Sequence, residues 1–246
     1  MTKAETIFAY ELSLIHDTTI KQFVITCFDK LCPDYFWTCP CSTTGKYHPQ
    51  VSLGIGGLVR HTKLAVWWGL ELIKALHGSP ELKDIALHTL QDEIIATLLL
   101  HDMIKNGKGL NTQGYPLEKG VTGTHGVTLA KKINDEINAP QMMTESYIRI
   151  VTGIALHMGI WTTKPYNATD CPGLEAFAQL IHLADYAASR KVDDIHNKLE
   201  KERTDDIIKK TADFLRTGKI EAGQGPPCPG VRKTESFSHD IHDFKD

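Results

Sequence analysis

Apolar residues recur at every third and fourth position through most of this chain, and that spacing constrains its fold more than any other feature. The period places an apolar stripe along an α-helix, whereas the alternation typical of half-buried strands is scarce. The run from Ile94 to Leu100 is the densest example, and clusters of Gly and Pro separate the helical blocks. We therefore expect an all-α protein built as a helical bundle.

The same periodicity predicts where the helices lie. One or two fall within residues 5–31, and others extend from the glycines at 54–57 to His77 and over 81–105, 125–133, 145–157, 174–202 and 202–216. We expect residues 1–45 to pack on a main domain of residues 46–217. Residues 218–246 are rich in Gly, Pro and charge, which predicts a flexible tail.

Composition sets broad limits on function. A chain of 246 residues with 41% hydrophobic content is long enough for one large core. The net charge of -3 gives no overall attraction to nucleic acid or to an anionic membrane. No stretch approaches the roughly 20 apolar residues of a membrane helix, and the first residues lack the apolar region of a signal peptide. We therefore expect a cytoplasmic protein with no membrane partner.

Four of the six cysteines lie close together, at positions 27, 32, 39 and 41. Their spacing, C-x4-C-x6-C-x-C, lacks the paired C-x2-C units that usually surround structural zinc. We therefore expect reduced thiols here and no zinc site.

Polar residues that can bind metal interrupt the apolar stripes or stand at helix ends in five places. They are His61, His101 with Asp102, His125, His157 and Asp185. Four imidazoles and two carboxylates suit Fe, Mn, Co or Zn better than a magnesium site lined only by oxygen. The alternative is that each histidine is a hydrogen-bonded core residue, since the His-Asp pair also occurs at 16–17, 239–240 and 242–243.

The order H…HD…H…H…D resembles the HD-domain superfamily of metal-dependent phosphohydrolases, over roughly residues 47–191. The stretch "GGLVRHT" at 56–62 is similar to the "GGLLEHT" of many bacterial members. "HDMIK" at 101–105 resembles the "HDIGK" of the branch that cleaves cyclic dinucleotides, and "LIHLADYAASRK" at 180–191 is similar to the family's last ligand helix. Many dinuclear members have a His-His pair where this chain reads "LHMG".

This resemblance implies an HD-type helical bundle with metal ligands on several helices. His61, His101, Asp102 and Asp185 would hold one ion, and His125 and His157 a second, with Asp102 bridging the two. The ions implied are two divalent transition metals, Mn, Fe, Co or Ni, with Mg as an alternative.

The implied activity is hydrolysis of a phosphoester in a nucleotide or short nucleic acid by water that the metals activate. Asp102 and Lys105 are the expected catalytic residues. Lys105 can also bind a phosphate oxygen, and Arg190, Lys46 and His48 are further candidates for substrate binding. The alternative for Lys105 is a solvated lysine at a helix end, favoured by the helix dipole.

Three other functions remain open. The same ligand set resembles the di-iron centre of inositol oxygenase and related phosphonate-cleaving oxygenases, which use the HD scaffold to activate oxygen. An HD-type 3'-5' exonuclease is a variant of the hydrolase hypothesis. The third is a regulatory module that binds a nucleotide without cleaving it.

Overall fold

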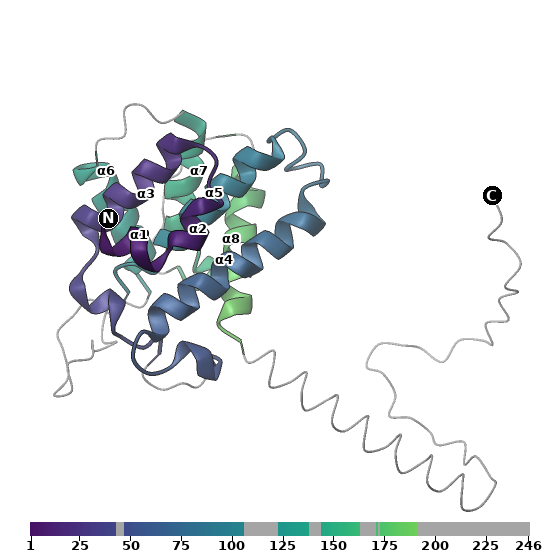
Figure 1. Ribbon diagram of the computed structural model, residues 1–246. Helices are drawn as coiled ribbons and strands as arrows, with labels where there is room; N and C mark the ends of the chain where they lie inside the picture. Colours follow the sequence, from purple (N-terminus) through teal and green to yellow (C-terminus); the bar gives the residue numbers. More distant parts are fainter. Residues whose placement is uncertain (43–46, 106–122, 138–143, 163–170, 172, 191–246) are drawn as a thin grey trace, which may run out of the picture. The chain divides into compact units, whose positions relative to one another are not determined.

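The computed structural model describes residues 1–42, 47–105, 123–137, 144–162, 171 and 173–190 (Figure 1). Across these residues the protein is all-α, as predicted, with eight α-helices, three short 3-10 helices and no strand. They all belong to one compact unit, Met1–Ile195. No helix in the described ranges has the length and apolar character that crossing a membrane requires.

The helices in chain order are α1 (Lys3–Ile7), α2 (Ala9–Ser13), α3 (Thr18–Leu31), η1 (Asp34–Trp37), η2 (Gln50–Ser52), α4 (Gly57–Leu76), α5 (Leu87–Leu100), α6 (His125–Glu136), α7 (Thr144–Leu156), η3 (Gly159–Trp161) and α8 (Leu174–Ala188).

Helix α5 forms the centre of the bundle. Every residue from Asp92 to Leu100 is buried, and α5 packs against α3, α4, α7 and α8. A helix that is apolar on nearly all sides must be enclosed by others. The residues that follow its last turn, His101 and Asp102, are therefore delivered into the interior.

Close approach between α4 and α5 depends on Gly69. A Cβ atom at this position would lie 2.5 Å from Cδ1 of Leu98 and 2.7 Å from Cγ2 of Ile94. Because glycine has no side chain, the two helices pack closely, and α4 also packs along α8. This packing brings the first turns of α4, including His61, next to the end of α5.

The first 42 residues pack on the same core. Phe8, Phe28, Phe36 and Trp37 form an aromatic cluster whose ring centroids lie 5.0–6.3 Å apart. Helix α3 contacts α5 and α6, so this segment covers one side of the bundle.

The helix predicted over 81–105 was too long. Helix α5 begins at Leu87 rather than at residue 81, and it ends at Leu100, after which residues 101–105 form turns. Helix α8 ends at Ala188, where the N–H of Ser189 donates to the carbonyl groups of Asp185 and Tyr186 in a tightened last turn. Residues 191–202 of the helix predicted over 174–202 lie outside the described residues. The predicted helix over 202–216, the domain boundary at 217 and the tail lie outside the described residues.

Candidate metal centre

The structure brings all six predicted ligands together. His61 comes from α4, Asp185 from α8 and His125 from the first turn of α6, whereas the others directly follow α5 and α7. The four histidines are fully buried, and the side chains of Asp102 and Asp185 are 1% and 12% exposed. They form two groups of ligand atoms: His61, His101, Asp102 and Asp185 in the first, and Asp102, His125 and His157 in the second.

Two of the imidazoles are oriented by the ends of their own helices. Nδ1 of His101 lies 2.6 Å from the carbonyl oxygen of Leu98, and Nδ1 of His157 lies 2.6 Å from that of Ile154. A carbonyl can only accept, so Nδ1 of each ring carries the proton and Nε2 keeps its lone pair. These carbonyl groups lie in a last helical turn, where no backbone N–H is available to them. Both Nε2 lone pairs therefore point into the centre.

The first group surrounds Nε2 of His61. This atom lies 3.0 Å from Oδ1 of Asp185, 3.3 Å from Oδ2 of Asp102 and 3.4 Å from Nε2 of His101. Nε2 of His101 lies 3.5 Å from Oδ1 of Asp185 and 3.6 Å from Oδ2 of Asp102. Two imidazoles and two carboxylates thus converge within a few ångströms.

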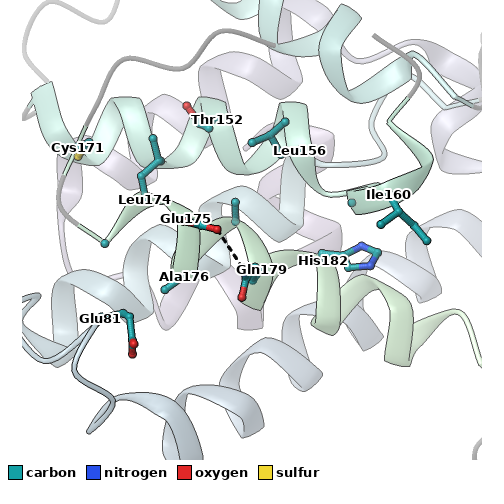
Figure 2. A pocket seen from close by; sticks show the side chains of 13 residues that line it. Glu81, Thr152, Leu156, Ile160, Cys171, Leu174, Glu175, Ala176, Gln179 and His182 are labelled. Atoms are coloured by element: carbon teal, nitrogen blue, oxygen red, sulfur yellow. Dashed lines mark hydrogen bonds between the residues drawn. The ribbon is translucent and has the colours of Figure 1, made fainter. Parts of the chain in front are cut away.

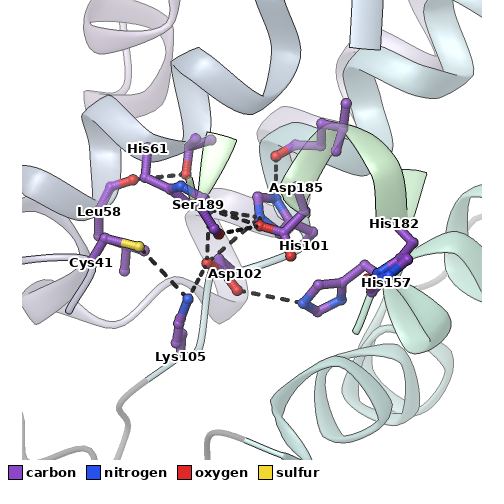
Figure 3. A network of polar contacts seen from close by, with 12 residues as sticks. Cys41, Leu58, His61, His101, Asp102, Lys105, His157, His182, Asp185 and Ser189 are labelled. Atoms are coloured by element: carbon purple, nitrogen blue, oxygen red, sulfur yellow. Dashed lines mark hydrogen bonds and ion pairs between the residues drawn. The ribbon is translucent and has the colours of Figure 1, made fainter. Parts of the chain in front are cut away.

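The second group uses the other oxygen of Asp102. Oδ1 lies 2.8 Å from Nε2 of His125 and 3.5 Å from Nε2 of His157, and these two nitrogens lie 2.8 Å apart. Figure 3 shows Asp102 between Lys105 on one side and the histidines on the other. One carboxylate therefore presents an oxygen to each group, which is the arrangement that a bridging ligand needs.

The two groups contain more acceptors than donors. The lone pairs on Nε2 of His101 and His157 face carboxylate oxygens and other imidazoles at 2.8–3.6 Å. Lone pairs that face one another repel, and a buried polar atom without a partner costs about 1–3 kcal/mol. A bound cation removes this repulsion, so the residues present fit a metal.

Both carboxylates are held in their ionised form. Burial raises the pKa of Asp102, but Lys105 and His101 outweigh it and hold that pKa well below its usual range. Burial likewise raises the pKa of Asp185, but the imidazoles of His101 and His61 outweigh it and hold that pKa well below its usual range. Burial lowers the pKa of His125, which favours the neutral imidazole that can bind metal.

Lys105 lies inside the protein rather than in solvent, so the alternative of a solvated lysine is wrong. Its side chain is 10% exposed, and Nζ lies 2.9 Å from Oδ2 of Asp102 and 3.6 Å from Sγ of Cys41. Burial lowers the pKa of Lys105, but Asp102, Cys41 and Asp185 together raise it above its usual value. The ammonium group is therefore a permanent positive charge beside the first group.

The other predicted substrate-binding residues are not all at the centre. Arg190 follows α8 and stacks on two aromatic rings, 4.0 Å from that of Tyr186 and 5.2 Å from that of Tyr47. His48 lies beside His61, with ring centroids 5.6 Å apart. Lys46 lies outside the described residues.

The position of Cys41 was not predicted from the sequence. The five described cysteines are free thiols, as expected, but Cys41 is fully buried beside His48 and His61. Burial raises the pKa of Cys41, but the charges of His61 and Lys105 outweigh it and lower that pKa to about 6. The spacing of the cysteines carries no signal for this contact, because the partners are histidines from other segments.

A large cavity lies away from the centre. Its volume is about 890 Å³, and residues of α7 and α8 such as Leu156, Leu174 and Gln179 line it (Figure 2). None of the six clustered ligands is among its lining residues. His182 connects the two regions, since its Nδ1 donates to the carbonyl oxygen of His157 at 2.7 Å.

No protein-family model matches this chain, and neither the curated proteins nor the solved structures give a significant match. The function of the chain is therefore inferred from the geometry of the buried histidines and aspartates.

Proposed function

We propose that this protein is a metal-dependent phosphohydrolase that cleaves a phosphoester of a nucleotide or short oligonucleotide at a dinuclear centre. The observation that carries the proposal is the position of Asp102, whose two oxygens face two separate groups of ligand atoms. The order of the ligands along the chain, which resembles that of the HD-domain superfamily, supports the same assignment.

In this proposal each group of side chains holds one cation. His61, His101 and Asp185 hold the first, and His125 and His157 hold the second. Two cations so held supply a water of lowered pKa and neutralise charge on a phosphoryl group. Manganese, iron, cobalt and nickel all accept such mixed nitrogen and oxygen ligands.

The substrate reaches the centre on the side of Asp185 and Lys105. Their side chains are 12% and 10% exposed, whereas the other five side chains of the centre are at most 1% exposed. Lys105 keeps its ammonium at this opening, where negative charge develops on the phosphoryl oxygens during attack. We assign it that stabilising role.

Arg190 is a further candidate for binding phosphate. It lies five residues beyond Asp185, and the rings of Tyr47 and Tyr186 hold its guanidinium in place. A guanidinium that stacks on aromatic faces still presents its N–H groups at its edge, where phosphate binds. We therefore keep Arg190 as the candidate for a second phosphate contact.

The test is hydrolysis of nitrophenyl phosphate mono- and diesters by protein loaded with manganese or iron. We expect turnover that Asp102→Ala abolishes and that Asp92→Asn, a change at a buried carboxylate within α5, retains. The preference between mono- and diester then separates a nucleotidase from a phosphodiesterase or exonuclease.

Absence of hydrolysis with both substrates and both metals would contradict the proposal. Oxygen uptake by the iron-loaded protein would then support the oxygenase, since the same six side chains suit a di-iron site. Nucleotide binding without either reaction would support a regulatory module.

A further inference from the structure

A second potential metal site lies on the other side of His61 from the two aspartates. Backbone hydrogen bonds hold Cys41 there, because its N–H donates to the carbonyl oxygen of Ser52 at 3.1 Å and the N–H of Leu58 donates to that of Cys39 at 3.0 Å. Gly57 permits this close packing, since a Cβ at that position would lie 2.3 Å from the carbonyl oxygen of Ser52. The thiol is thus placed under the first turn of α4.

Three ring nitrogens around this thiol are buried and have no hydrogen-bond partner among the described residues. They are Nδ1 of His61 and both Nδ1 and Nε2 of His48. His101 and His157, by contrast, donate from Nδ1 to a carbonyl oxygen. Buried polar atoms in folded proteins almost always have a partner, and an ion or water is a common explanation when none is visible.

The ligand atoms are close enough for a metal. One nitrogen of His48, one nitrogen of His61 and Sγ of Cys41 lie within 4.8 Å of one another. Zinc bonds of about 2.3 Å to sulfur and about 2.0 Å to nitrogen in a tetrahedron place ligand atoms roughly 3.5 Å apart. The three side chains therefore need to move together by about 1 Å at most to close around an ion.

We propose that Cys41, His48 and Nδ1 of His61 bind a divalent cation that prefers sulfur and nitrogen ligands, with zinc as the first candidate. Thiolate and imidazole select such cations, whereas the oxygen-rich groups around Asp102 accept manganese or iron. Three protein ligands leave a fourth position of the tetrahedron open.

His61 connects the two sites. Its Nε2 faces Asp102 and Asp185, and its Nδ1 is available to the sulfur site. When both sites are filled, His61 would offer Nε2 to one cation and Nδ1 to the other, and the remaining proton of the neutral imidazole would be released to solvent. The sulfur site does not depend on whether the protein hydrolyses phosphoesters.

The experiment is a cobalt titration of the metal-free, full-length protein, followed by absorption spectroscopy. Cobalt bound to a thiolate gives a near-ultraviolet charge-transfer band, whereas cobalt bound only to histidine and aspartate does not. We expect the intensity of this band to correspond to one thiolate-bound cobalt per chain, to saturate by three equivalents because the other centre takes up two, and to bleach when zinc is added.

The variants assign the band to its ligands. Cys41→Ser and His48→Ala should both remove it, while Cys39→Ser, a matched change two residues away, should keep it. Asp102→Ala should also keep it, although that variant loses the visible cobalt bands of the other centre. Circular dichroism verifies that each variant is folded.

Two results would overturn the proposal. One is cobalt binding to the wild-type protein with no charge-transfer band. The other is a band that survives Cys41→Ser or His48→Ala in folded protein. Because the sulfur band is read separately from turnover, this outcome is distinguishable from failure of the hydrolase proposal.

Discussion

Two buried polar clusters lie along α5 and just beyond its end, and they differ in how their charges are paired. In the first half of the helix, both oxygens of Glu93 accept from Arg149, with Nε at 2.7 Å and Nη2 at 2.8 Å, and Ser146 donates to one of them at 2.5 Å. Just beyond the helix, His101 and Asp102 meet other imidazoles and a second carboxylate. One cluster is satisfied by protein groups, whereas the other has acceptors facing acceptors.

The comparison shows that burial alone does not mark a functional site. The side chains of Glu93 and Asp102 are 0% and 1% exposed. What separates them is the balance of donors and acceptors, because Arg149 supplies the donors that Glu93 needs. We infer that the Glu93 cluster is structural and that the Asp102 cluster is built for a ligand that supplies positive charge.

The largest loss of metal and activity should come from removing the negative charge of Asp102, which the two ligand groups share. Asp102→Asn keeps the shape of the side chain but removes its negative charge. We expect bound manganese or iron to fall below about a tenth of the wild-type content and turnover to fall by at least about 1,000-fold, because the proposed centre then lacks its bridging carboxylate. Elemental analysis and the nitrophenyl assay measure both.

Asp92→Asn is the matched control, since Asp92 is equally buried but binds the backbone N–H groups of His16 and Asp17. If Asp92→Asn lost as much metal as Asp102→Asn, the distinction between structural and ligand-binding carboxylates would be wrong.

Changes in the Glu93 cluster should lower the free energy of unfolding and leave metal binding unchanged. Arg149→Met leaves a buried carboxylate without its cation, which costs about 3–5 kcal/mol of unfolding free energy. The double variant Glu93→Leu with Arg149→Met should recover most of that loss, because no unpaired charge remains. Urea denaturation measures both values, and metal content per folded chain should stay at the wild-type level.

Much of the fold follows from local sequence. The three- and four-residue period predicts the helices, and it also predicts that His61 and Asp185 lie on inward faces, where the structure places them. Helix ends were harder to predict. The apolar pattern continues past Ser189, but a tightened turn ends α8 at Ala188.

Contacts between loops could not be predicted from the sequence. Cys41 meets His61 because Gly57 lets two backbone segments approach, and no periodicity encodes that approach. The burial of Lys105 has a similar origin. Its place inside the protein depends on the turns after α5 and on the partners Asp102 and Cys41, which only the assembled fold provides.

A smaller loss of metal binding should follow from crowding the contact that brings His125 and His157 together. Gly126 follows His125, and a Cβ there would lie 2.5 Å from the carbonyl oxygen of Ile154 and 2.9 Å from the ring of His157. Gly126→Ala should therefore cost about 1–3 kcal/mol, as overpacking does. It should also weaken metal binding by about 10–100-fold, because it displaces the carbonyl group that orients His157.

Titration with manganese, followed by calorimetry, distinguishes the two ligand groups around Asp102. In Gly126→Ala, only one of the two binding events should weaken. Gly69→Ala is the matched contrast, because it crowds α4 against α5, the packing that places His61, and should therefore weaken the other event instead. Equal weakening of both events in Gly126→Ala would show that the groups do not act separately.

The smallest effect should come from the other described His-Asp pair. Asp17 is the N-cap of α3, and its Oδ1 accepts from the N–H groups of Thr19 at 2.7 Å and Ile20 at 3.2 Å. Asp17→Ala should cost about 1 kcal/mol, as the loss of an N-cap does. Thermal unfolding measures the cost, and metal content and turnover should remain unchanged. The same His-Asp dipeptide occurs twice in the described ranges: at 16–17 it caps a helix, whereas at 101–102 it meets other imidazoles because α5 ends in the interior. The surroundings, and not the dipeptide, would therefore decide whether metal binds. A loss of metal in Asp17→Ala would contradict that explanation.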